Sequence, residues 1–145
     1  MWTSKLATEY PNLTAIEFDF VNALTAAVAS FIFGSAWYGV LGKVWMQAAS
    51  LAEEMTKPKA GPMLAALGCQ ILMALILGVM LDGMQAGSIK DAVAVAVLLW
   101  IGLVLTTQIV NHRFQGRPWS LTWIDSGHWL GVLVIQALTL SFMNS

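Results

Sequence analysis

The chain has 145 residues, of which 58% are hydrophobic and 10% charged, with a net charge of −1 and a mean hydropathy of +0.72. Soluble domains average about 45–50% apolar and about 25% charged residues. The composition therefore excludes a water-soluble fold, a disordered chain and a basic nucleic-acid-binding protein, and it predicts an integral membrane protein surrounded by the lipid bilayer.

Four windows of the sequence contain no charged residue, and each has the length of a membrane span. They are Phe20–Gly42, Ala60–Leu81, Ala92–His112 and Ser126–Ser145. An α-helix rises about 1.5 Å per residue, so about 20 residues cross a hydrocarbon core of about 30 Å. Short alternating strands typical of a β-barrel are absent from the sequence. We predict an all-α fold, a four-helix transmembrane bundle that forms one domain over residues 1–145.

Local signals indicate where these helices begin. Thr14–Glu17 has capping-box spacing before the first span, and Ser88–Asp91 has a similar pattern before the third. Pro62 suits the first turn of the second helix. Asp125 or Ser126 is expected to cap the fourth helix.

The segment Lys43–Lys57, between the first two spans, combines apolar and polar positions. This pattern predicts a short amphipathic helix that lies at the membrane surface and ends at Pro58.

The basic residues predict an orientation across the membrane. Five of the seven belong to the 43–59 and 113–125 loops, and only Lys5 and Lys90 belong to the other side. Because Lys and Arg accumulate in cytoplasmic loops, both of those loops are expected inside and both termini outside.

Small and polar residues within the spans predict how the helices pack. Ser30 and Gly34 follow Ala26 at four-residue spacing, and Gly127 and Gly131 form a GxxxG pair. Such faces, together with buried amides, hold helices together in lipid. The spans also contain three glutamines: Gln70, Gln108 and Gln136. We expect Gln70 and Gln136 to face protein, either as packing contacts or as the lining of a polar path.

Aromatic and polar residues accumulate at the inner end of the predicted bundle. They are Trp37, Tyr38, Trp45, Asn111, His112, Arg113, Trp123, Asp125 and His128. Two interpretations remain open, an aromatic belt at the membrane interface or a small-ligand binding site. His112, Asp125 and His128 do not have a known metal-ligand spacing, so neither a metal nor another cofactor is predicted. The sequence also lacks the common catalytic signatures, and no catalytic residue is assigned.

Two stretches of the chain resemble a known family. Phe33–Gly39 reads FGSAWYG and is followed by GKVWM from Gly42; later come NHRF from Asn111 and IDSGH from Ile124. These segments resemble a family of short, four-span, mainly bacterial membrane proteins catalogued only as a domain of unknown function. The resemblance extends from about Phe20 onward and implies four spans in a bacterial cytoplasmic membrane. His128 stands where the family pattern has an aromatic residue, typically tyrosine.

Three functional hypotheses follow. The first is a non-enzymatic membrane protein that acts as a homo-oligomer or as the accessory subunit of another membrane protein. The second is a channel or carrier for a small neutral or weakly polar solute. The third is a small-ligand or cofactor site at the aromatic inner end.

Overall fold

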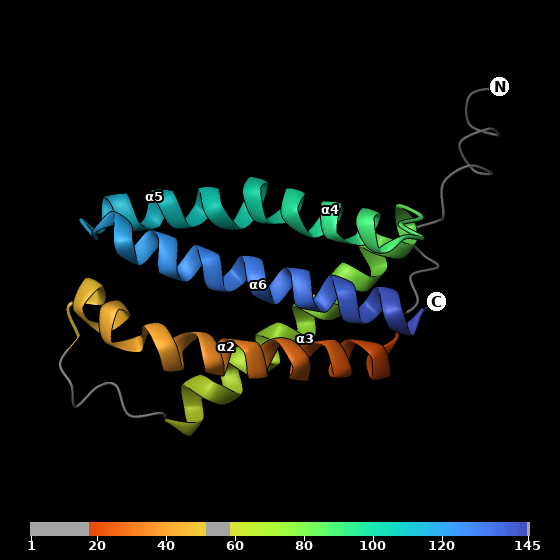
Figure 1. Ribbon diagram of the computed structural model, residues 1–145, viewed down its shortest axis with the longest axis horizontal. Helices are drawn as coiled ribbons and strands as arrows, with labels where there is room; N and C mark the ends of the chain where they lie inside the picture. Colours follow the sequence, from red (N-terminus) through yellow and green to blue (C-terminus); the bar gives the residue numbers. More distant parts are fainter. Residues whose placement is uncertain (1–17, 52–58, 145) are drawn as a thin grey trace.

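Four long helices make up most of the computed structural model, which describes residues 18–51 and 59–144 (Figure 1). They are α2 (Phe20–Ala49), α3 (Ala60–Gly83), a third helix that continues through α4 (Ile89–Leu99), the π-helical η3 (Trp100–Leu105) and α5 (Thr106–Phe114), and α6 (Trp119–Met143). Each of the four is long and apolar enough to cross a membrane, and the described residues contain no strand. The predicted all-α, four-span fold is confirmed.

Polar side chains cap two of the helices at their N-termini. The Asp19 carboxylate accepts a hydrogen bond from the Asn22 backbone N–H at 2.9 Å. Ser88 accepts from the Asp91 backbone N–H at 3.2 Å, and its hydroxyl donates to the Asp91 carboxylate at 2.6 Å. The cap at Ser88 and the position of Pro62 in the first turn of α3 are as predicted. The expected capping box at residues 14–17 lies outside the described residues.

The fourth helix begins earlier than its charge-free window. It starts at Trp119, after Pro118, so Asp125 lies more than one turn inside the helix and Ser126 is buried. The prediction that Asp125 or Ser126 caps this helix is wrong. The prediction assumed that a charged residue marks the end of a span. Asp125 instead lies inside the helix, because other side chains of the protein pair with its carboxylate.

The first helix is also longer than its window. It continues to Ala49 and ends at Ser50, which adopts a left-handed conformation with φ 55°. The first part of the segment expected to form a separate surface helix, Lys43–Lys57, is therefore the last part of α2, and residues 52–58 lie outside the described residues. Arg117 Nη1 donates to the Ala49 carbonyl at 2.9 Å, so a basic side chain caps this helix end.

α6 is the central helix of the bundle and packs against α2, α3 and α4. The small residues predicted to mediate packing lie along its contact with α2: Ala26, Ser30 and Gly34 on α2, and Gly127 and Gly131 on α6. A Cβ atom on Gly127 would lie 3.1 Å from the Trp37 ring, and one on Gly131 would overlap the Phe33 ring. Close approach of these two helices therefore requires glycine at position 131, whereas at position 127 a side chain would require the Trp37 ring to shift by a few tenths of an ångström.

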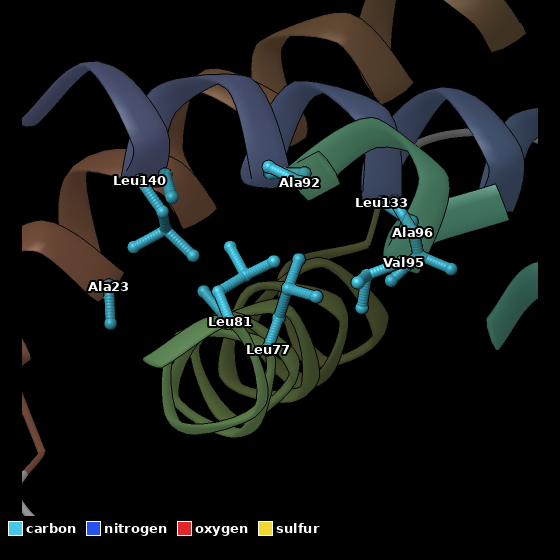
Figure 2. Close-up of a cluster of buried hydrophobic side chains, with 11 residues drawn as sticks. Ala23, Leu77, Leu81, Ala92, Val95, Ala96, Leu133 and Leu140 are labelled. Carbon is cyan, nitrogen blue, oxygen red and sulfur yellow. The ribbon is translucent and has the colours of Figure 1, made fainter. Parts of the chain in front are cut away.

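The apolar core lies in the half of the bundle where α2 begins and α6 ends. Figure 2 shows its buried side chains in close-up. Leu77 and Leu81 of α3 pack there with Leu133 and Leu140 of α6 and with small residues of α4. At the same end, Asn22 Nδ2 donates to Asn144 Oδ1 at 2.8 Å and joins the start of α2 to the end of α6.

α3 crosses the bundle obliquely (Figure 1). Its second half enters the apolar core, where Ala74, Leu77 and Leu81 are buried. Its first half diverges from α6 (Figure 1). This crossing leaves space between the three helices at the opposite end from the core.

Candidate ligand-binding site

A half-buried carboxylate connects three helices at the end of the bundle opposite the core. Asp125 Oδ1 accepts hydrogen bonds from the Tyr38 hydroxyl at 2.9 Å and from Trp45 Nε1 at 2.8 Å. Asp125 Oδ2 lies 3.7 Å from His112 Nε2 on α5. Since both oxygens contact donors on other helices, Asp125 fixes α2 and α5 against α6.

Thr122 and Arg113 form a second set of polar contacts, on the Nδ1 side of the His112 ring. Thr122 Oγ1 lies 3.0 Å from His112 Nδ1 and accepts a hydrogen bond from Arg113 Nη2 at 3.0 Å. Arg113 can only donate, so the Thr122 hydroxyl proton is available to His112 Nδ1. This arrangement favours the tautomer that carries its proton on Nε2, the nitrogen facing Asp125. The Arg113 guanidinium also stacks over the Trp119 ring at 4.0 Å.

Two further indole groups attach to the backbone of α6. Trp37 Nε1 donates to the Ile124 carbonyl at 3.1 Å, and Trp100 Nε1 donates to the Ser126 carbonyl at 2.7 Å. Trp37 was predicted as a site residue, whereas Trp100 was not. Its signal in the sequence is its position within a span, because an indole N–H surrounded by lipid requires a protein acceptor.

A cavity of about 730 Å³ lies beside this cluster, between α2, α3 and the first half of α6. Its volume falls within the range of about 300–1,000 Å³ typical of small-molecule sites. Tyr38 and Trp45, the two donors to Asp125, also line the cavity, so the carboxylate holds part of its wall in position. Most of the remaining wall is apolar and includes Phe31, Met46, Pro62, Met63 and Ala66.

The polar groups of the cavity wall lie at different depths. Lys43 and Lys59 are exposed and lie where α2 approaches its end and α3 begins. His128 and Gln70 lie deeper and are buried. The sequence predicted Lys43 in the surface segment and both lysines on the inner side of the membrane. Their position beside the aromatic residues was not predicted, because that proximity depends on the α2–α3 hairpin.

Not every predicted site residue joins this region. Trp37, Tyr38, Trp45, His112, Arg113, Asp125 and His128 gather around the carboxylate or the adjoining cavity. Asn111 is exposed, and Trp123 is 57% exposed and stacks on Trp119. Both lie on the outer faces of their helices, and neither lines the cavity. The described residues contain no group of three His, Cys, Asp or Glu side chains that could hold a metal ion.

The buried glutamines form a separate polar contact in the middle of the bundle. Ser30 Oγ donates to Gln70 Oε1 at 2.7 Å, and Gln136 Nε2 donates to Ser30 Oγ at 3.1 Å and to the Gln70 carbonyl at 3.0 Å. The prediction that Gln70 and Gln136 face protein is confirmed. Gln108, on the third helix, is partly exposed and does not line the cavity.

These features define a small membrane protein built on four apolar helices. A family model described as "Protein of unknown function (DUF1761)" matches residues 21–141, and the chain belongs to this family. The resemblance expected from the GSAWYG and NHRF segments is thereby confirmed. Neither the comparison with curated proteins nor the comparison with solved structures found a match.

Proposed function

We propose that this protein binds one amphipathic ligand, with an acidic head and an apolar tail, in the cavity between α2, α3 and α6. The observation that carries the proposal is the distribution of groups along the cavity wall. Two lysines lie at one end, and aromatic and aliphatic side chains line most of the remainder.

The depth of the cavity supports a ligand from the lipid class. Lys43 and Phe31 both line it and are twelve residues apart on α2, which corresponds to about 18 Å along a helix. Half of a hydrocarbon core of about 30 Å is about 15 Å. A molecule with its head at the lysines and its tail beside Phe31 would therefore extend through about one leaflet.

The charges at the cavity end favour an acidic head group. Lys43 and Lys59 are both exposed there, and long lysine side chains reach from apolar surface to the membrane interface. Within the described part of the chain, this end of the bundle carries four of the five Lys and Arg residues. By the positive-inside rule, the ligand would come from the cytoplasmic leaflet, where anionic lipids accumulate.

Packing inside the chain weakens the motivation for the other two hypotheses. The small-residue faces that suggested an oligomer are used between α2 and α6 of the same chain. The polar residues that suggested a channel do not line a continuous path. Leu77, Leu81 and Leu140 fill the bundle between the central glutamines and the Asn22–Asn144 pair. The aromatic cavity is the feature that these contacts within the chain do not explain.

Tryptophan fluorescence in detergent tests the proposal, since Trp45 and Trp129 line the cavity. Titration with dibromostearate should quench the fluorescence saturably, and unlabelled stearate should reverse the quenching. The double variant Lys43→Gln/Lys59→Gln should bind about three- to tenfold more weakly, because exposed ion pairs contribute up to about 1 kcal/mol each.

Lys90→Gln is the matched control, because Lys90 is an exposed lysine outside the cavity. It should bind dibromostearate as the unaltered protein does. Quenching that never saturates, or that is the same in the double variant and in the control, would contradict the proposed site.

A further inference from the structure

The cavity wall contains a buried imidazole that an acidic head and a plain apolar tail would not use. His128 is 6% exposed, and its ring lies 4.9 Å from both the Tyr38 and the Trp129 ring centroids. Its Nδ1 atom is buried and has no hydrogen-bond partner among the described residues. A neutral imidazole offers one donor and one acceptor, and leaving such groups unpaired in an apolar site is unfavourable.

Gly34 makes room for this imidazole against the backbone of α2. A Cβ atom at Gly34 would lie 2.7 Å from His128 Nε2, and Gly34 also lines the cavity. Because Gly34 and His128 both line the cavity, the ring edge that carries Nε2 lies at the cavity wall, whereas Nδ1 is enclosed by protein.

The position of His128 along the cavity falls within the length of a bound tail. Gly34, which contacts its ring, precedes Lys43 by nine residues on α2, or about 14 Å along the helix. Beyond it, Phe31 and Gln70 continue the wall. A chain whose head contacts the lysines would thus pass the imidazole before its end.

We infer that the natural ligand is an acidic lipid with a hydroxyl group in the middle of its chain, which hydrogen-bonds to His128 Nε2. This inference rests on the proposed function and narrows its ligand class. A hydroxyl both donates and accepts, so it pairs with the imidazole in either tautomer. The aromatic rings around His128 exclude competing polar contacts and make the site selective for that one position.

Native mass spectrometry with two probes of equal chain length tests the inference. Stearate and a mid-chain hydroxystearate are titrated separately against the full chain in a volatile detergent. The hydroxylated probe should bind about three- to tenfold more tightly, as expected for one net hydrogen bond. His128→Phe should lose the preference for the hydroxylated probe, whatever its affinity for stearate, and His128→Gln, which retains hydrogen-bonding groups, should recover part of the preference.

The outcomes separate this inference from the proposed function. Binding of neither probe would overturn both. Equal binding of the two probes, or an unchanged preference in His128→Phe, would overturn the inference and leave the lipid site standing. If His128→Phe does not fold, the unaltered protein and His128→Gln still decide, because equal binding of both probes to the unaltered protein contradicts the hydroxyl contact.

Discussion

Asp125 shows how one side chain organises the aromatic end of the molecule. Its carboxylate accepts from Tyr38 and Trp45 on α2 and approaches His112 on α5. Tyr38 and Trp45 also form part of the cavity wall. The shape of the cavity therefore depends on the Asp125 carboxylate, which does not itself line the cavity. In a membrane, a charge away from the surface persists only where the protein supplies such partners.

Replacement of Asp125 by alanine should destabilise the protein by about 1–3 kcal/mol. The change removes the shared acceptor and leaves the Tyr38 hydroxyl and the Trp45 N–H without a partner. Thermal unfolding in detergent measures the effect, with Asp82→Ala, at an exposed aspartate, as the matched control. Equal unfolding temperatures for the two variants would show that the carboxylate contacts do not stabilise the bundle.

Residue types indicated this cluster, but not which of its members face one another. His112 and Asn111 are neighbours, and successive residues on a helix point about 100° apart, so only one of them contacts Asp125. Trp123 and Asp125 are two positions apart and face different sides for the same reason. Sequence could therefore predict the end of the bundle where the residues gather, whereas the helix rotation that selects among them depends on tertiary packing.

At the scale of helices, the contact between α2 and α6 determines the fold. The Phe33 and Trp37 rings of α2 pack against glycines on α6, and the His128 ring of α6 packs against Gly34 on α2. Each helix thus places an aromatic ring where the other has no side chain. This exchange brings both helices close enough for Ser30 of α2 and Gln136 of α6 to hydrogen-bond.

Gly131→Ala should destabilise the protein by about 1–3 kcal/mol, because the added methyl group would overlap the Phe33 ring. Gly68→Ala is the matched control, since nothing lies within 4 Å of the added atom. That control should be neutral or stabilising by up to about 1 kcal/mol, as alanine favours the helix. Unfolding by a denaturing detergent compares the two variants. A Gly131→Ala protein as stable as the control would contradict the close contact.

The charge-free windows identified all four helices but not the space between them. They gave the right order and number, and the GxxxG pair identified the α6 face that meets α2. The cavity arises because α3 crosses obliquely and leaves α6 in its first half (Figure 1). A crossing angle results from the fit of many side chains, and no window or motif in a single sequence encodes it.

For the whole molecule, the distribution of basic residues predicts that the cavity end faces the cytoplasm. The α5–α6 loop and the start of α3 belong to this end, and the α3–α4 loop lies at the other. In a Cys69→Ser background, Gly116→Cys should resist a membrane-impermeant maleimide in intact cells, whereas Gly87→Cys should react. The reverse labelling pattern would contradict the orientation and assign the ligand to the outer leaflet.

The most direct measurement of the central claim is native mass spectrometry of the protein purified in a mild detergent. The unaltered chain should retain one acidic amphiphile per molecule, and so should Ala65→Trp, because Ala65 is exposed and lies outside the cavity. Ala66→Trp should lose the bound molecule, because Ala66 lines the cavity and the indole would fill it. Equal retention by Ala65→Trp and Ala66→Trp, or no bound amphiphile in the unaltered chain, would contradict the account.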